Sequence, residues 1–507
     1  MRQERSIKNL FYGLLSFVIT TIMSVVIPRL FLLSYGSEVN GLISSVKQIF
    51  AYFLLLEAGV GGAARQALYG PIAKKDKKEV SAILTATNNF YKKIALIYGS
   101  AVIVLAVIYP LTVKSEISKI VIICIILFQG EAGVIKYLIT GKLQLLIQVD
   151  GKNYILTNIS TVFSIFSNAA RIILLYMGAG VLWVQGVFCI VDLCQVAIIV
   201  IYTYREYPWV SFKEQPNYSA ISQKNSVLVH QIAGLIFNNT DTIILTFFCG
   251  LKTVSVYAMY TMLYGMVANI IGYISSSVSF AMGQLFNSDI KRFKKIQECY
   301  ENYYLCFSFA LFSIAYIFIT PFLKLYTSGV NDIKYIDKIL PIMFLIIQLL
   351  NYGRTTSGNI IDYAGHYKKT QNRSIIETII NILISLIGVA RFGIYGVLLG
   401  TIAALLYRTN DMIIYANHVI MKRSAIPTYR RWIRNIILSI CVAFAGRFLP
   451  SEYNGYVQII VYAAVVMMIV LCVFFFINTV LEKEARTTGY AYISNFMHKR
   501  LCKDARY

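Results

Sequence analysis

The sequence has 507 residues, of which 57% are hydrophobic and only 14% are charged, and its mean hydropathy is +0.64. A soluble domain typically has about 25% charged residues, so this composition excludes a soluble protein and indicates a polytopic membrane protein. The formal net charge of +23 does not indicate nucleic-acid binding, because the basic residues lie in short loops between apolar segments. The lipid bilayer, and no nucleic acid, is therefore an expected partner.

Long apolar segments alternate with basic loops and predict an all-α protein with about fourteen transmembrane helices. Basic residues number about thirty in the loops on one side of the membrane and eight on the other. The positive-inside rule therefore predicts a multi-pass protein of the cell membrane with both termini in the cytoplasm. The predicted spans are residues 8–33, 41–69, 90–110, 119–140, 154–177, 181–203, 226–249, 254–284, 299–322, 338–361, 374–392, 394–419, 433–449 and 456–480.

Features of the first half of the chain recur in the second half at a nearly constant offset in the numbering. Gly36, followed by a helix and by Asp76 in a basic loop, matches Gly250, followed by a helix and by Asp289 in a basic loop. Such a repeat predicts two pseudo-symmetric six-helix lobes, which is typical of transporters. The predicted parts are an N-terminal lobe at 1–210, a C-terminal lobe at 211–425, and two accessory helices with a basic cytoplasmic tail at 426–507.

The second span carries Lys47, Glu57 and Arg65 although it is long and apolar enough to cross a bilayer. Lys47 and Arg65 are separated by a whole number of turns of a continuous helix, so we expect them to share one face. Lys47, Arg65 and Arg354 have few acidic residues near them in the sequence. An under-neutralised cationic lumen favours an anionic substrate, and guanidinium groups suit phosphate.

Polar residues also follow one face of the seventh and eighth spans. Asn238 and Asp241 in the seventh span are candidates for binding a proton or a sodium ion, and the alternative is that they cross-link helices. Tyr264 belongs to a stripe in the eighth span that either lines a cavity or mediates helix packing.

Other ionisable residues within spans have structural explanations. Glu131 and Lys136 are expected to share a helix flank, and Arg408 is expected to pair with Asp411 one turn later. Arg171, like Arg29, is expected to extend to a membrane interface.

Two runs carry a family resemblance: YGSEVNGLISSVKQIFAYFLLLEAGVGGAARQALYGPIAKKDKKEV, and later NNTDTIILTFFCGLKTVSVYAMYTML. They resemble polysaccharide repeat-unit flippases (Wzx-like) of the MATE-like MOP exporter superfamily. The resemblance implies two six-helix lobes in a V shape, two C-terminal accessory helices and alternating access. It implies transport of an undecaprenyl-diphosphate-linked oligosaccharide from the cytoplasmic to the outer leaflet for surface polysaccharide biosynthesis. Polysaccharide polymerase and chain-length proteins are the protein partners that it implies.

In related flippases, arginines of the first, second and eighth helices are thought to hold the diphosphate. Arg29 and Arg65 occupy comparable helices, the eighth span has no arginine, and Arg354 of the tenth is the suggested substitute. The expected substrate-binding residues are Arg29, Lys47, Arg65, Arg354 and Tyr264. The candidate ion-coupling residues are Asp241, Asn238 and Glu57.

Two alternatives remain open. A MATE-type ion-coupled antiporter of drugs or metabolites would share the fold, but the basic excess argues against organic cations. A membrane polysaccharide polymerase or ligase usually has a large external loop, whereas the longest one here, near 323–337, is short. We therefore expect a transporter and not an enzyme, with no cofactor or metal. In the absence of a P-loop motif, the expected energy source is a Na+ or H+ gradient or the membrane potential.

Overall fold

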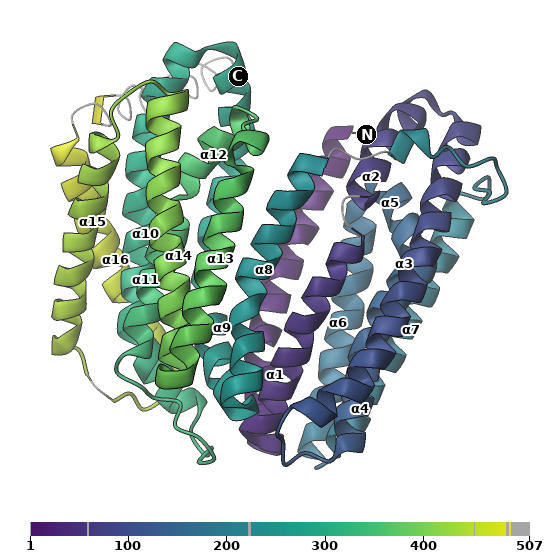
Figure 1. Ribbon diagram of the computed structural model, residues 1–507, viewed down its shortest axis with the longest axis horizontal. Helices are drawn as coiled ribbons and strands as arrows, with labels where there is room; N and C mark the ends of the chain where they lie inside the picture. Colours follow the sequence, from purple (N-terminus) through teal and green to yellow (C-terminus); the bar gives the residue numbers. More distant parts are fainter. Residues whose placement is uncertain (1, 58–59, 222–224, 451, 483–485, 488–507) are drawn as a thin grey trace, which may run out of the picture. The chain divides into compact units, whose positions relative to one another are not determined.

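The computed structural model describes residues 2–57, 60–221, 225–450, 452–482 and 486–487. Helices account for nearly all of this part of the chain, and it contains no β-strand (Figure 1). The predicted all-α class is confirmed. The distal basic tail lies outside the described residues. The chain forms two compact units: unit 1 is residues 1–258 with 329–333, and unit 2 is residues 259–328 with 334–507. The lobe boundaries predicted near 210 and 425, and the V shape, stay predictions.

Unit 1 contains the helices of the first seven predicted spans. They are α1 (Arg2–Phe53), η1 (Leu54–Leu56), α2 (Val60–Lys74), α3 (Lys77–Thr112), α4 (Lys119–Ile135), the π-helical η2 (Lys136–Thr140), α5 (Gly141–Val149), α6 (Asn153–Tyr176), α7 (Val181–Glu206), η3 (Ser219–Ile221) and α8 (Asn225–Cys249). The first residues of α9 (Leu251–Ser288) also belong to unit 1. The segment 329–333 joins this unit because Asp332 accepts hydrogen bonds from the backbone N and the Oγ of Ser37, at 2.8 and 2.5 Å.

Unit 2 contains the rest of α9 and the later helices. They are α10 (Ile290–Tyr326), α11 (Leu340–Gly353), α12 (Thr355–Tyr363), α13 (Tyr367–Phe392), α14 (Ile394–Ile414), the π-helical η4 (Tyr415–Ile420), α15 (Ile426–Ala445), η5 (Gly446–Phe448) and α16 (Tyr456–Leu481). Buried ion pairs attach α15 to α10, since Arg431 contacts Glu301 at 3.3 Å and both side chains are 2% exposed. Arg431 also pairs with Glu482, just after α16.

Eleven helices of the described chain are long and apolar enough to cross a membrane, so the protein is a multi-pass membrane protein. The three further predicted spans are helical as well. The first predicted span lies within α1, and the second begins in α1 and ends in α2. Helix α1 continues across non-helical backbone at Gly36. The tenth is divided into α11 and α12 at Arg354. The thirteenth, α15, carries three arginines near its N-terminus.

The backbone supports the internal repeat. Gly36 and Gly250 both have positive φ, 77° and 81°, where a helix gives way to the next one. Gly151 and Gly365 also have positive φ, and the members of both pairs are separated by the same offset in the numbering. These are conformations that glycine adopts without steric cost. Asp76 and Asp289, separated by almost the same offset, likewise cap the N-termini of α3 and α10 by accepting a backbone N–H.

Glycines bring α13 and α14 into direct backbone contact. A Cβ on Gly396 would lie 2.1 Å from the carbonyl carbon of Gly388, and a Cβ on Gly400 would lie 2.2 Å from Ser385 Oγ. Small residues that allow such close approach are a common basis of helix packing in membranes, where lipid provides little hydrophobic drive between helices.

Replacing Gly396 with alanine is therefore expected to destabilise unit 2 by about 1–3 kcal/mol or more, because the two backbones must separate. The matched control is Gly265→Ala in α9, where a Cβ would meet nothing within 4 Å. Thermal unfolding of the two purified variants in the same detergent checks this. Equal melting temperatures would show that the α13–α14 contact is not needed for stability.

Candidate functional site

In unit 1, Glu57 connects two irregular helical segments. It directly follows η1, where the second predicted span is interrupted, and its carboxylate reaches the π-helical η2. Its Oε1 accepts a hydrogen bond from the Tyr91 hydroxyl at 2.7 Å, and its Oε2 accepts from Lys136 Nζ at 3.1 Å and from Tyr137 at 3.2 Å. A Cβ on Gly61 would lie 2.2 Å from Oε1, so glycine makes room for the carboxylate.

These contacts change the interpretation of two predicted residues. Glu57 is a candidate for ion coupling, but in this structure its carboxylate is occupied by three donors. Lys136 pairs with Glu57 and not with Glu131, which instead accepts a hydrogen bond from the Cys189 thiol. Sequence spacing could not reveal this arrangement, because Tyr91 and Lys136 are distant from Glu57 in the sequence.

Lys47 and Arg65 are both exposed, and neither has an acidic partner within ion-pair distance in the part of the chain that the structure describes. The expectation that whole helical turns align them fails, because the helix is interrupted between Phe53 and Val60. Arg65, on α2, is close enough to Tyr91 to interact with it electrostatically. Arg65 and Glu57 therefore both lie near one tyrosine, and Lys47 belongs to the preceding helix.

The predicted polar residues of the seventh span, α8, face different surroundings. Asp241 is 3% exposed and accepts a hydrogen bond from Tyr257 at 3.3 Å. Asn238 is exposed, and its Nδ2 donates to the carbonyl of Gly234 at 2.7 Å, one turn earlier in the same helix. Of the two residues, Asp241 alone has the buried position that an ion-binding carboxylate needs.

Polar contacts hold the later part of α1 against α8 and the start of α9. Ser45 and Thr246 hydroxyls are 2.7 Å apart, as are those of Tyr52 and Thr240, and Asn40 donates to Ser255 at 2.7 Å. The Tyr52 hydroxyl also lies near the Asp241 carboxylate. Much of the polar surface of the later part of α1 is thus used for packing, and Asp241 lies at the contact of α1 with α8.

In the first predicted span, too, some polar residues are used for helix packing. Asn9 Oδ1 accepts a hydrogen bond from the Tyr154 backbone N at 2.6 Å, and Ser16 accepts from Thr161 at 2.8 Å, so part of its polar face packs against α6. Arg29 follows Pro28 inside α1 and is half-buried. Its predicted contact with substrate stays a prediction.

In unit 2, Arg354 lies at the break between α11 and α12 and is neutralised. Its Nη1 is 2.5 Å from Glu377 Oε1, so the expectation that nearby acids are too few is wrong for this residue. Arg408, 2% exposed, contacts the same glutamate at 3.5 Å and pairs with Asp411 at 2.5 Å, which confirms the predicted Arg408–Asp411 pair. Arg373 also pairs with Asp411. Three arginines thus share two carboxylates.

Tyr264 is a core residue in this structure. Its side chain is fully buried, its hydroxyl donates to the carbonyl of Pro341 at 2.8 Å, and its ring stacks on Phe344. A side chain with no exposed surface and an occupied hydroxyl cannot contact a substrate in this conformation. The packing interpretation of the eighth-span stripe therefore holds at this position.

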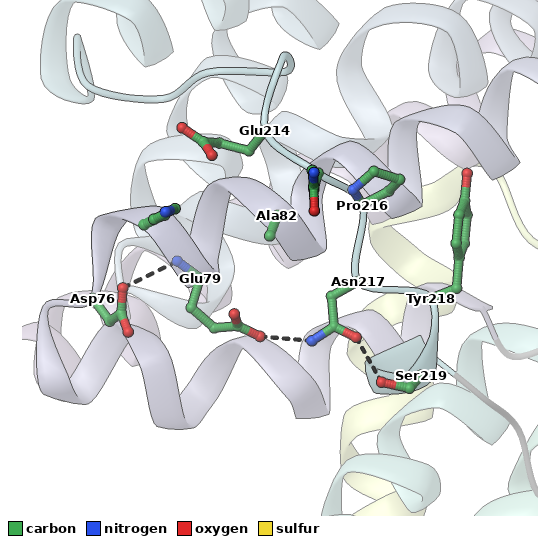
Figure 2. Close-up of a pocket in the computed structure, with 10 residues that line it drawn as sticks. Asp76, Glu79, Ala82, Glu214, Pro216, Asn217, Tyr218 and Ser219 are labelled. Atoms are coloured by element: carbon green, nitrogen blue, oxygen red, sulfur yellow. Dashed lines mark hydrogen bonds between the residues drawn. The ribbon is translucent and has the colours of Figure 1, made fainter.

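A pocket of about 790 Å³ lies between the start of α3 and the segment before η3 (Figure 2). Three carboxylates line it, from Asp76, Glu79 and Glu214, together with one lysine. Figure 2 shows Glu79 directed toward Asn217, whose Nδ2 donates to it at 2.8 Å. An acidic pocket does not suit an anionic ligand, so it is not part of the predicted cationic site.

No protein-family model matches the sequence, and no curated protein matches it either. Solved structures do match. The chain is similar to the lipid II flippase MurJ in an inward closed conformation, with 13% identity, a TM-score of 0.64, and coverage of 93% of this chain and 100% of that one.

The chain is also similar to an inward-facing multidrug resistance MATE family transporter of the MOP superfamily. That match has 13% identity, a TM-score of 0.58, and coverage of 80% and 96% of the two chains. The MATE multidrug transporter DinF-BH matches with 14% identity, a TM-score of 0.54, and coverage of 82% and 95%. The protein thus shares the helical fold of these membrane transporters.

Proposed function

We propose that the protein is a flippase that moves undecaprenyl-diphosphate-linked oligosaccharide from the cytoplasmic to the outer leaflet. One observation carries the proposal: Lys47, in the candidate membrane span of α1, and Arg65, on α2, are exposed cations of unit 1 without acidic partners among the described residues. Lys136, Arg354 and Arg408, by contrast, are paired with carboxylates. Because an unpaired charge is costly in lipid, Lys47 and Arg65 are expected to face water and an anionic substrate.

The chemistry of a diphosphate suits this pair of cations. Guanidinium presents a fork of donors that matches phosphate oxygens, and an ammonium group adds a second positive charge. The fold shared with a lipid II flippase supports a lipid-linked substrate. The sugar-linked undecaprenyl diphosphate itself is proposed from the sequence resemblance.

A MATE-type antiporter is the second candidate, because MATE transporters share the fold. An ion-coupled antiporter needs a carboxylate that binds the coupling ion. The buried Asp241 is the observation in unit 1 that favours this candidate.

The deciding experiment uses cells that lack this protein. Mass spectrometry would quantify undecaprenyl-diphosphate oligosaccharide, and an impermeant oxidant of sugars would report which leaflet holds it. We expect accumulation in the inner leaflet that re-expression reverses. Normal lipid levels and an intact surface glycan would instead favour the antiporter.

Asp241→Asn is expected to abolish the dependence of transport on the Na+ or H+ gradient while leaving the fold intact. The reason is that Asp241 is a buried carboxylate at the contact of α1 with α8, and ionisable residues within membrane spans commonly mark ion sites. Transport into proteoliposomes with and without each gradient measures this. Glu116→Gln, which alters an exposed carboxylate of unit 1, is the control, and unchanged gradient sensitivity in Asp241→Asn would leave Asp241 a packing residue.

A further inference from the structure

Arg171, in α6, is a membrane arginine whose charge no described residue neutralises. Its Nε is buried and has no hydrogen-bond partner, and its guanidinium stacks on Phe188 of α7, whose ring centroid is 3.9 Å from the guanidinium carbon. An aromatic ring stabilises a cation but does not neutralise its charge, so Phe188 alone does not compensate the desolvated part of Arg171.

The position of Arg171 on its helix shows that it faces away from the exposed side of α6. The exposed side of α6 carries Phe166, Ile173 and Tyr176, which are 64%, 58% and 81% exposed. At about 100° per residue, each of these lies about 140–160° around the helix from Arg171. The guanidinium therefore points into unit 1, toward α7. The expectation that Arg171 reaches a membrane interface stays a prediction.

A second unsatisfied group lies on the same side of α6. Ser167 is one turn before Arg171, its side chain is 4% exposed, and its Oγ is buried without a hydrogen-bond partner. Residues one turn apart lie one above the other on a helix. A half-buried cation with a buried, unsatisfied Nε and a buried, unsatisfied hydroxyl together form the kind of surface that binds an oxyanion.

We propose that Arg171 and Ser167 bind a phosphate group of a lipid headgroup, and that this lipid is the diphosphate-linked substrate at a late stage of its passage. The inference rests on the proposed function.

Two contacts show how far along the helices this site lies. Ser16 of α1 contacts Thr161 of α6, and Tyr35 donates to the carbonyl of Ala179, just after α6, at 2.6 Å. The two helices α1 and α6 therefore run in the same direction.

Arg171 therefore lies toward the Tyr35 end of α1, which the loop charges predict to be the outer end. Arg65 lies in the same helix as Lys74, which begins the loop predicted to be cytoplasmic. A lipid diphosphate that leaves Arg65 would thus find a second guanidinium near the opposite leaflet. In this scheme Arg171 and Ser167 complete the substrate path within unit 1.

The test measures lipid binding by native mass spectrometry on the purified full-length protein. The probes are a polyprenyl diphosphate and a phosphatidylglycerol, and the variants are Arg171→Gln, Ser167→Ala and Arg65→Gln. We expect Arg171→Gln to weaken polyprenyl diphosphate binding about tenfold or more, Ser167→Ala to weaken it less, and phosphatidylglycerol binding to change little. Arg447→Gln is the control, since Arg447 also stacks on a phenylalanine ring but is exposed.

Each outcome has a separate meaning. Equal loss of both lipids in Arg171→Gln would overturn the assignment to the substrate and identify a site for bulk phospholipid. Unchanged binding of both lipids by Arg171→Gln would overturn the phosphate site at Arg171 and Ser167. If Arg65→Gln is then the one variant that loses polyprenyl diphosphate binding, the proposed function stands without that site. If Arg171→Gln fails to fold, Arg171→Lys retains the charge but not the fork of donors, and undiminished diphosphate binding by that variant would contradict bidentate recognition.

Discussion

Replacing Arg65 with alanine is expected to abolish transport without loss of folding. Arg65 is exposed on α2 and has no acidic partner among the described residues, so its removal leaves no buried carboxylate unpaired. It does remove the guanidinium that is proposed to hold the diphosphate. The loss of a charge-assisted, bidentate contact is worth about 1.5–3 kcal/mol, or at least tenfold in affinity. Undecaprenyl-diphosphate oligosaccharide should accumulate in the inner leaflet of cells that express the variant.

Two comparisons make the Arg65 result specific. Arg205→Ala removes another exposed arginine, at the end of α7, and it should leave export unchanged. Arg65→Lys keeps the charge and should retain part of the activity. Normal export by a well-expressed Arg65→Ala protein would exclude Arg65 from the substrate path. Of the two cations on which the proposed function rests, Lys47 alone would then remain.

The fold could be predicted from this sequence to a large extent, and for a simple physical reason. Apolar segments must be about 20 residues long to cross a bilayer, and their backbone must be helical to satisfy its own hydrogen bonds. Predicted spans such as 154–177 and 181–203 accordingly match α6 and α7 within a few residues. The repeat was visible because Gly36 and Gly250 hold positive φ, a backbone requirement that leaves a direct mark on the sequence.

Helix interruptions and charge partners were less predictable. Composition does not distinguish a continuous helix from one interrupted between Phe53 and Val60, so the alignment of Lys47 with Arg65 did not hold. The i, i+3 pair Arg408–Asp411 could be predicted, because helix geometry brings such residues together. The Lys136–Glu57 pair could not, since its members come from different helical segments.

Burial within the membrane was the least predictable property. Tyr264 and Arg65 both look like polar residues in apolar spans, yet Tyr264 is fully buried and Arg65 is exposed. In soluble proteins a polar residue usually marks the surface, but in a bundle of membrane helices polar groups also hydrogen-bond across helices. The Tyr264 hydroxyl does so by donating to Pro341. This partner is distant in the sequence and becomes visible only in the folded chain.

The second large effect concerns the stability of unit 2. Glu377→Gln is expected to lower the free energy of unfolding by about 3–5 kcal/mol, because it removes one of two carboxylates shared by three arginines. Arg354 and Arg408 both contact Glu377, and Arg408 is 2% exposed, so water cannot replace the lost negative charge there. Thermal unfolding of the purified variant in detergent measures the effect.

The matched control for Glu377 is another glutamate that forms an ion pair, Glu116. Its carboxylate is 3.6 Å from Lys252, but its side chain is 84% exposed, so Glu116→Gln should change stability by less than about 1 kcal/mol. If both variants unfolded at the wild-type temperature, the cluster around Arg408 would be less dry than its burial indicates. A large effect confined to Glu377→Gln would mean that the break at Arg354 is held by charge, because Arg354 joins α11 to α12 and its guanidinium fixes that junction to α13.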